Sequence, residues 1–439
     1  MRLEKSRSLE MDSDSVFNVQ QELARMRRAV RLTQWLILAL ALLVVVLLVA
    51  LAAVGGTQGR LIRGLKRREG LLDYPNVTFA SNSGYRNVDG LTYGGSLFRG
   101  SGFWAAKTSL PEILTDHLAI SAGGYAYIIG GESNGTVTAD VWRFDPIFHN
   151  YTKMSSMPAP VYRFGATLLD NGREDTIYIV GGRNSTIDTA AYMVTSVFIY
   201  DIPSNTWSQG TDAPYPQSDT CAGSFYGKVY QIGGYDADYN YLNYTFVYDP
   251  TTKEWSRTTD MPTARGDHMC ANFMGEIYSL GGYYNDGNST DQNSFCPKME
   301  SFNPNTSVWT TRPNLLTPRG DAAISVLPGN SLMLVGGEGH YDNDQNFKYP
   351  KHVNEIFYYD DDTWVEKAFI PTARFRTAAA TVEGLTYVFG GQDTCIDQTV
   401  GCNSFNTNEV FLDLDHPHLY IYLTNEAYND NAALTTYPF

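Results

Sequence analysis

The sequence predicts an all-β fold built from six copies of one repeated unit, preceded by a single transmembrane helix. Three observations predict it: the composition, a Gly-Gly motif that recurs about every 50 residues, and an apolar run near the N-terminus. The chain of 439 residues is rich in Gly (39), Tyr (30) and Phe (21), and 18% of it is charged. Because glycines and aromatic residues suit strands joined by tight turns, this composition argues against a helical or disordered chain.

The apolar run extends from Trp35 to Val54 and contains 20 residues without a polar interruption. At a rise of about 1.5 Å per residue, such a helix spans a bilayer core of roughly 30 Å. A cleaved signal peptide usually has a shorter apolar core behind a short leader, whereas 34 residues precede this run. We therefore expect a retained membrane helix, with a cytoplasmic tail over 1–34 and a juxtamembrane stalk over 55–99.

The orientation of this helix follows from the N-glycosylation sequons, because basic residues flank both ends of the run and leave the positive-inside rule undecided. Seven Asn-x-Ser/Thr sequons without a central Pro all follow the run. They predict a single-pass type II glycoprotein whose ectodomain is lumenal or extracellular, in the Golgi, another endomembrane or the plasma membrane. Lys66–Arg68 is either a charged anchor near lipid head groups or a processing site that releases the ectodomain. The sequon asparagines are Asn76, Asn134, Asn150, Asn184, Asn243, Asn288 and Asn305.

The repeated unit contains an apolar strand that ends in Gly-Gly, and its six copies lie 48 to 55 residues apart. In five units a later strand ends in an aromatic residue followed by Asp or Asn, and another aromatic residue stands five to seven positions beyond the first. A link with Pro, and often Arg, leads to the next unit. A period near 50 with four short strands predicts the blade of a β-propeller. The link arginines are Arg163, Arg265, Arg319 and Arg374.

These marks resemble the kelch repeat, and the resemblance covers about residues 100–425. It implies a six-bladed kelch-type β-propeller of the galactose oxidase/kelch-like superfamily, followed by a C-terminal tail over 426–439. We expect scaffold roles for the shared residues: Gly-Gly avoids the aromatic side chain of a neighbouring strand and permits a positive φ, and the Asp caps backbone amides. The fourth-strand tryptophans expected in the scaffold are Trp207, Trp255, Trp309 and Trp364.

The ring is expected to close through the strand that contains Trp104, which resembles the fourth strand of a blade. It would pair with the third strand of the last unit, Asn408–Leu414, and so remove the open sheet edges. The segment His418–Leu423 competes with it for that place.

A ligand is expected on the face that carries the long loops after Gly-Gly, which the links between blades share because strands alternate in direction. Exposed aromatic residues beside hydrogen-bonding groups suit sugar stacking or a protein hot spot. The alternative is that the polar residues keep the loops soluble and the aromatic residues pack at the base of each loop. The partner we predict is a protein or a glycan. The candidate residues are Tyr235, Asp236, Tyr239, Tyr241, Tyr283, Tyr284, Tyr341, Asp342, Phe347 and Tyr349, with Arg265, Arg319 and Arg374 of the links.

Catalysis has weaker support in the sequence. Glu132 and Glu338 follow Gly-Gly at equivalent positions and, with His340, are candidates for acid–base chemistry on a sugar, or else for hydrogen bonds between blades. The resembled superfamily includes copper-radical galactose oxidases and a six-bladed N-acetylneuraminate epimerase, but fold does not settle function. We find no matching copper set of two His and a Tyr cross-linked to Cys.

We therefore favour a binding or scaffolding module over a membrane-tethered sugar-modifying enzyme, and we expect no cofactor. A central pocket lined by paired carboxylates and Arg would favour the enzyme. A shallow aromatic face would favour the binding module. A nucleic-acid partner is excluded because the net charge is −15, and most of it lies after the apolar run.

Cysteine spacing predicts no metal site, and the carboxylates of one loop leave open only a looser cation site. The segment Asp342–Asn346 resembles the start of a calcium loop, but Phe347 stands where an EF-hand needs Gly, so an EF-hand is excluded. The remaining predictions concern the five cysteines. We expect a disulfide between Cys395 and Cys402, buried unpaired side chains at Cys221 and Cys270 in the first strands of adjacent blades, and a free thiol at Cys296.

Overall fold

In the computed structural model the described residues are all-β, and their single helical element is a 3-10 turn, Ala190–Tyr192. The described residues are 102–173, 175–187, 189–287, 294–341, 344–393, 403–413, 423–424 and 434–435.

The described residues form six antiparallel sheets of four strands each. From the innermost strand outward, the first blade contains β2 (Leu118–Ala122), β3 (Tyr125–Ile129), β6 (Val141–Asp145) and β7 (Asn150–Lys153). The second contains β8 (Gly165–Leu168), β9 (Thr176–Val180), β10 (Val197–Asp201) and β11 (Thr206–Gln209). The third contains β12 (Cys221–Phe225), β13 (Lys228–Tyr235), β14 (Tyr241–Asp249) and β15 (Glu254–Arg257).

The other three blades follow the same plan. The fourth contains β16 (Met269–Phe273), β17 (Glu276–Leu280), β20 (Met299–Asn303) and β21 (Val308–Arg312). The fifth contains β22 (Ala323–Leu327), β23 (Ser331–Val335), β26 (Asn354–Tyr358) and β27 (Thr363–Glu366). The sixth contains β28 (Ala378–Val382), β29 (Leu385–Phe389), β30 (Asn408–Leu412) and β1 (Phe103–Lys107).

Short two-stranded ribbons add to the blades. They are β4 (Glu132–Ser133) with β5 (Thr136–Val137), β18 (Tyr283–Tyr284) with β19 (Ser294–Phe295), β24 (Glu338–Tyr341) with β25 (Asp344–Pro350), and β31 (Leu423–Thr424) with β32 (Leu434–Thr435).

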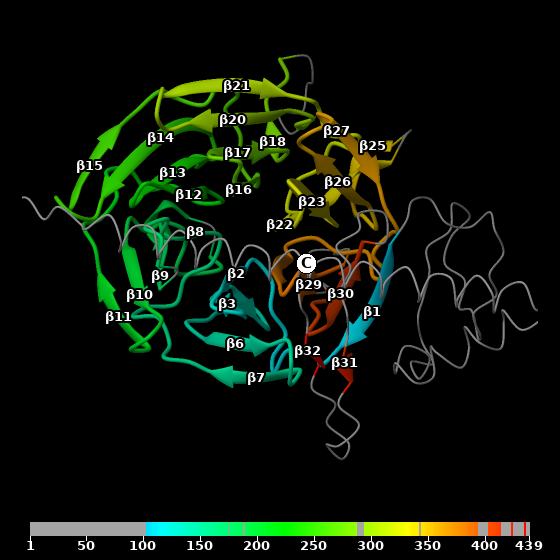
Figure 1. Cartoon of the computed structure of the whole chain (residues 1–439). Coiled ribbons are helices and arrows are strands. Elements are labelled where there is room, and N and C mark those ends of the chain that lie inside the picture. The colour runs from blue at the N-terminus through cyan, green and yellow to red at the C-terminus, as the bar shows by residue number, and fades with distance from the viewer. Residues whose placement is uncertain are drawn as a thin grey trace, which may run out of the picture. The chain divides into compact units, whose positions relative to one another are not determined.

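The innermost strands surround one central axis (Figure 1). Each innermost strand contacts those of the two adjacent blades, and β28 of the last blade contacts β2 of the first. The prediction of a closed six-bladed propeller is therefore confirmed.

The sixth blade is completed by β1, which pairs antiparallel with β30 so that Trp104 lies opposite Phe411. The Trp104 side chain is buried, and its Nε1 donates to the carbonyl oxygen of Ala368 at 2.7 Å. The prediction that this strand closes the ring is confirmed. In the competing segment, Leu423 is the one described residue, and it belongs to β31, which pairs with β32.

The fourth-strand tryptophans belong to the scaffold, as predicted. Trp207 packs on Tyr200 of the third strand with ring centroids 4.8 Å apart, and its Nε1 donates to the carbonyl oxygen of Ser155 in the preceding link at 2.8 Å. Trp309 repeats the arrangement, with a 2.9 Å bond to the carbonyl oxygen of Thr259. Each such tryptophan thus ties its blade to the one before it.

The expected reason for Gly-Gly was only partly right. At Gly336 and Gly337 the φ angles are +67° and +93°, which L side chains rarely adopt. A Cβ atom at these positions would lie 2.6 Å from the carbonyl oxygen of Arg374 and 2.7 Å from that of Gly320. In this copy the collision would be with the backbone of the links, whereas a Cβ atom at Gly130 would also lie 2.9 Å from the aromatic ring of Phe164.

The fold class needs one correction, because the prediction of a preceding transmembrane helix was wrong for the structure described. The described residues contain no α-helix, and none of their helical elements is long and apolar enough to cross a membrane. Their apolar segments are mostly strands of about five residues that pack between blades, whereas a spanning helix needs about 20. The run Trp35–Val54, the tail 1–34 and the stalk 55–99 lie outside the described residues.

Candidate functional site

Six equivalent residues, one just before the innermost strand of each blade, surround the central axis, and we call them the central ring. All six have φ angles between 50° and 55°. Asp219 N donates to the carbonyl oxygen of Arg163 at 2.8 Å, and Arg376 N donates to that of Asp321 at 2.8 Å, so hydrogen bonds link ring residues of adjacent blades. A left-handed backbone is uncommon for such residues and marks a constrained site. The central ring consists of Asp116, Arg163, Asp219, Asp267, Asp321 and Arg376.

The ring has an excess of negative charge, with four carboxylates and two guanidinium groups. Arg163 lies 3.5 Å from both Asp116 and Asp219, and Arg376 lies 3.6 Å from both Asp116 and Asp321. Among the described residues Asp267 forms no ion pair. The basic half of the ring is therefore centred on Asp116, and three aspartates follow one another in the opposite half.

The acidic half holds protons at neutral pH. Burial, together with the charge of the neighbouring Asp321, raises the pKa of Asp267 to about 7. The pKa of Asp321 also rises to about 7, mainly through burial. Burial and the charge of Asp267 raise the pKa of Asp219. Neighbouring buried carboxylates resist ionising together, so this half favours either a proton or a bound cation.

The residues directly after Gly-Gly form a second layer beside the ring. Glu132 pairs through its backbone with Thr115, and Glu338 pairs with Gly320, so each lies next to the residue that precedes a ring aspartate. The predicted catalytic candidates Glu132 and Glu338 thus lie beside the central ring. Burial, helped by Asp116, raises the pKa of Glu132. The layer consists of Glu132, Arg183, Tyr235, Tyr283, Glu338 and Gln392.

Tyrosine hydroxyls connect this second layer to the carboxylates. Tyr235 donates to Asp267 Oδ2 at 2.8 Å, and Tyr283 donates to Glu338 Oε1. Burial and these carboxylates raise the pKa of both tyrosines. Both phenols therefore stay neutral and act as hydrogen-bond donors to the site.

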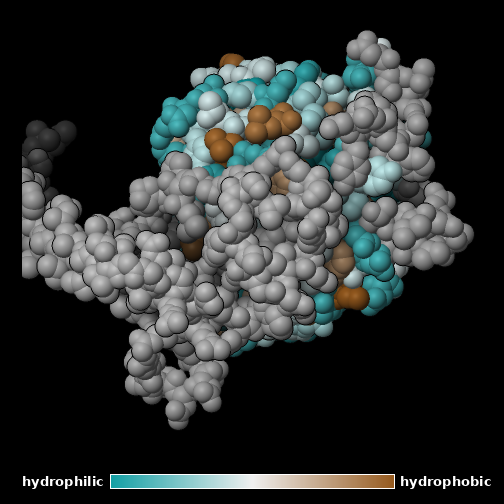
Figure 2. Space-filling view, turned by 90° about the vertical axis from the view of Figure 1, so that its right-hand side faces the viewer, coloured by the Kyte–Doolittle hydropathy of each residue, from teal (hydrophilic) through white to brown (hydrophobic). Residues whose placement is uncertain are grey.

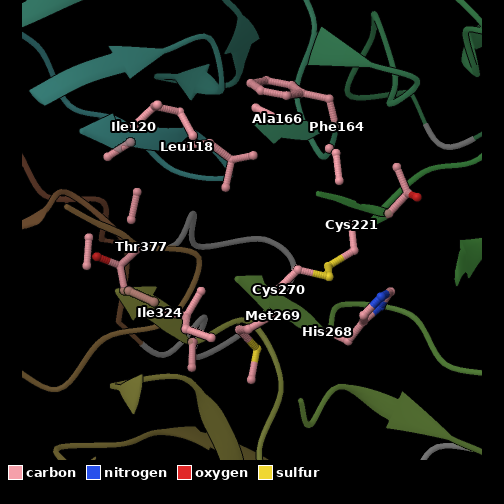
Figure 3. Close-up of a pocket in the computed structure, with 18 residues that line it drawn as sticks. Leu118, Ile120, Phe164, Ala166, Cys221, His268, Met269, Cys270, Ile324 and Thr377 are labelled. Carbon is pink, nitrogen blue, oxygen red and sulfur yellow. A yellow bond between two sulfur atoms is a disulfide. The ribbon is translucent and has the colours of Figure 1, made fainter. Parts of the chain in front are cut away.

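Two adjoining cavities lie on the axis. One, of about 90 Å³, is lined by all six ring residues. The other, of about 140 Å³, is lined mainly by small and apolar side chains of the innermost strands, including Leu118, Ala166, Met269 and Ile324 (Figure 3). Leu118 and Met269 line both cavities, so the two cavities adjoin. We call the cavity lined by the ring residues the polar mouth and the cavity between the innermost strands the apolar channel.

Figure 3 also shows a disulfide between Cys221 of β12 and Cys270 of β16. The prediction of two unpaired cysteines was therefore wrong. The innermost strands of adjacent blades lie side by side, with these Cα atoms 5.7 Å apart, within the range that a disulfide spans. Cys296 is free and buried, as predicted. The predicted pair Cys395–Cys402 lies outside the described residues.

His268 lies beside this disulfide, and burial lowers its pKa to about 3, so the imidazole is neutral. In the described part of the chain, Cys221, His268 and Cys270 are the group whose ligand atoms lie close enough for a metal ion. A disulfide offers no thiolate ligands, and we assign no metal to this group.

The three predicted ligand-binding arginines all lie inside the blades. Arg319 and Glu355 are both fully buried, with Nη1 2.8 Å from Oε2. Arg265 and Arg374 make equivalent ion pairs with Glu300 and Glu409. Each of these arginines precedes a ring residue by two positions. Arg163 looked equivalent to them in the sequence, but the structure places it in the central ring.

Of the predicted loop residues, the tyrosines at the connection between β13 and β14 gather beside the central ring. The ring centroid of Tyr235 lies 5.7 Å from that of Tyr239 and 5.3 Å from that of Tyr241. The guanidinium carbon of Arg183 lies 4.9 Å from the centroid of Tyr239, which is 40% exposed. Asp236 instead holds its own loop, accepting hydrogen bonds at 2.9 Å from the backbone of Asp238 and Asn240. These rings form an aromatic group at the edge of the mouth.

The other loop candidates are less clustered. Tyr283 packs on Phe295 at 4.5 Å, and the ring of His340 lies 4.8 Å from Phe295. Tyr284 and Tyr349 are half-buried. Asp342 and the side chains of Tyr341 and Phe347 lie outside the described part of the chain.

Where Figure 2 shows described residues, they are mainly hydrophilic, and apolar residues occur in small groups. The described sequons are mostly accessible. Asn134, Asn150, Asn184 and Asn305 are exposed, and Asn243 is half-buried. Asn76 and Asn288 lie outside the described residues.

Comparison with known proteins agrees with this architecture. The sequence model of the Attractin/LZTR1 β-propeller family matches residues 127–400, more than half of the chain. Kelch-like protein 35 of Mus musculus is 33% identical over 137 residues, 31% of this chain and 21% of that protein. Kelch-like protein 23 of Homo sapiens is 29% identical over 118 residues, 27% of this chain and 20% of that protein. The match thus spans about a fifth of the length of these relatives.

A solved structure titled "Structure of YjhT" superposes with a TM-score of 0.56 at 14% identity, covering 69% of this chain and 95% of that one. At this identity the likeness shows the fold alone.

Proposed function

Because the chain belongs to the Attractin/LZTR1 β-propeller family, we propose that its kelch-type propeller is a binding module that holds a protein ligand on the long-loop face. The observation that carries this proposal is the aromatic group of Tyr235, Tyr239 and Tyr241 beside the charged mouth of the ring. Rigid aromatic side chains next to fixed polar groups are the usual anchors of a protein interface. A glycan that stacks on the same tyrosines is the alternative ligand.

The size of the central cavity supports binding over catalysis. Its volume of about 90 Å³ is well below the roughly 300–1,000 Å³ of pockets that enclose a small molecule. A complete sugar would therefore rest on the mouth rather than inside it. The ligand surface is then the face around the ring, with the ring at its centre.

One observation favours a second function, acid–base chemistry on a small sugar. Paired carboxylates and Arg do line the central cavity, which is the arrangement that would favour an enzyme. The pKa of Asp267, raised to about 7 by burial, suits a group that exchanges protons at neutral pH. Exchange NMR on free monosaccharides tests this function. Accelerated anomeric or epimeric exchange that Asp267→Asn abolishes would support it, and rates equal to buffer would rule it out.

We also propose that the propeller works in a lumenal or extracellular compartment. The disulfide Cys221–Cys270 and the exposed sequons support this proposal, since disulfides persist in oxidising compartments and sequons are used there. Expression through a secretory system followed by deglycosylation tests it. Loss of mass on deglycosylation would support the proposal, and an unchanged mass would contradict it.

The binding proposal is tested with arrays of extracellular proteins and glycans, probed with the full chain. Tyr239→Ala should weaken any selected ligand at least tenfold, because Tyr239 is 40% exposed in the aromatic group. Tyr226→Ala is the matched control, since Tyr226 is 72% exposed but lies in a hairpin between first and second strands, on the opposite face. Equal losses in both variants, or no loss in either, would contradict the assignment of the long-loop face.

A further inference from the structure

We propose that the central ring binds a primary ammonium group on a short alkyl chain, with Asp219 and Asp267 holding the ammonium. This inference rests on the proposed function only in using the same face of the propeller. The ammonium has two potential sources, a free alkylamine and a lysine side chain of a protein ligand.

The first argument is a buried carboxylate oxygen that no N–H group or neutral hydroxyl group reaches. Asp219 Oδ2 accepts no hydrogen bond from such a donor among the described residues, although the side chain is 2% exposed and lines the cavity. Its other oxygen lies 3.5 Å from Arg163, too far for a direct hydrogen bond. Asp219 and Asp267 are hydrogen-bonded to each other through a proton, and a group that brings N–H donors can take the place of that proton.

The second argument is the distribution of charge. Asp219, Asp267 and Asp321 succeed one another around the ring, and the arginines lie on the other side of it. An ammonium group carries three donors and no acceptor, which matches a half-ring of carboxylates. An anion would meet three carboxylates there.

The third argument separates an organic cation from a metal ion. Within the described residues, the ring carboxylates do not form a group compact enough to ligate a metal, and the group that does is Cys221, His268 and Cys270. The neighbouring carboxyl groups of Asp219 and Asp267 suit a cation that donates hydrogen bonds at about 2.8 Å from nitrogen to oxygen.

The fourth argument is the apolar channel that adjoins the polar cavity. The two cavities, of about 90 and 140 Å³, share lining residues such as Leu118, Phe164 and Met269. An ammonium group in the first leaves its alkyl chain two routes, into the apolar channel or outward to the long-loop face. A free alkylamine would use the first route and a partner's lysine the second.

The test is isothermal titration of the full chain with methylammonium, n-butylammonium and Nα-acetyl-lysine amide at pH 8. We expect saturable binding of at least one of them, weakened at least tenfold by Asp267→Asn and unchanged by Asp260→Asn at the surface. Asp219→Asn, which removes the other ammonium partner, should weaken binding in the same way. Both Asn variants resemble a protonated aspartate, so we expect them to fold.

The chain length then identifies the source. An affinity that rises about fourfold per methylene, the ratio equal to about 0.8 kcal/mol, places the alkyl chain in the channel and favours a free amine. Equal affinity for methylammonium and Nα-acetyl-lysine amide indicates that the alkyl chain points out to the long-loop face, as the side chain of a partner's lysine would. Absence of binding by all three probes, binding insensitive to Asp267→Asn and Asp219→Asn, or Ca²⁺ competing below 1 mM would overturn the proposal. The array experiment on Tyr239→Ala is independent of these results, so each proposal can fail alone.

Discussion

Removing one partner of the buried pair Arg319–Glu355 should destabilise the propeller severely. Both side chains are fully buried, and Arg319 also donates to the carbonyl oxygens of Thr317 at 2.8 Å and Leu334 at 2.9 Å. In Glu355→Leu the guanidinium stays charged but loses its carboxylate. Breaking such a pair from one side costs about 3–5 kcal/mol of unfolding free energy, because an uncompensated charge remains buried.

The double variant Arg319→Met/Glu355→Leu should recover most of that loss, since removing both charges also removes their desolvation penalty. Asp260→Asn is the control, because the Arg257–Asp260 pair is exposed, with side chains 47% and 30% accessible. A surface pair contributes about 0–1 kcal/mol, so this variant should change little.

Urea unfolding followed by tryptophan fluorescence measures all three variants. The reasoning would be refuted if Glu355→Leu lost less than about 1 kcal/mol, or if the double variant were no more stable than the single one. Either result would mean that water or a rearranged partner reaches Arg319. The arginine would then be available for a ligand role.

Three further predictions concern the disulfide, the central ring and the sequons. Cys270→Ser should lower the unfolding free energy by about 4 kcal/mol, because a disulfide between cysteines 49 residues apart restricts the unfolded chain by about that much. Guanidinium unfolding measures the loss, and Cys296→Ser is the control for substitution of a buried cysteine. The pKa of Asp267 is about 7 in the folded state and exceeds its unfolded value, so protonated Asp267 stabilises the fold below pH 4 and this stabilisation is lost as the pH rises to about 7. Over that pH range the melting temperature of the wild type should therefore fall relative to that of Asp267→Asn. Parallel melting curves of the two proteins would contradict this prediction. Asn305→Gln should remove one glycan's mass from protein made in a secretory system, and an unchanged band would exclude that site.

The sequence alone determined the blades. Gly-Gly, the aromatic–Asp step and the fourth-strand Trp are local signals within about 50 residues, and each acts through short-range packing or backbone geometry. The six Gly-Gly copies also predicted ring closure, down to the strand of Trp104, because a propeller with an open edge leaves backbone groups unpaired.

The sequence had a further signal that was missed. Two residues before each innermost strand, every unit has Asp or Arg, from Asp116 to Arg376. Within one unit such a residue looks like part of a polar link. Its role appears only when six of them meet, since the closed ring and the left-handed backbone aim all six side chains at one axis.

Tertiary structure alone decided which polar residues of the links are buried inside a blade and which line the central axis. A shift of two positions separates Arg163 in the ring from the equivalents of Arg319 inside the blades, and composition and spacing do not reveal it. The pairing of Cys221 with Cys270, 49 residues apart, was likewise fixed by the adjacency of innermost strands. Local patterns determine strands and turns because those interactions are near in sequence. The site depends on contacts between blades, and these exist only once the ring has closed.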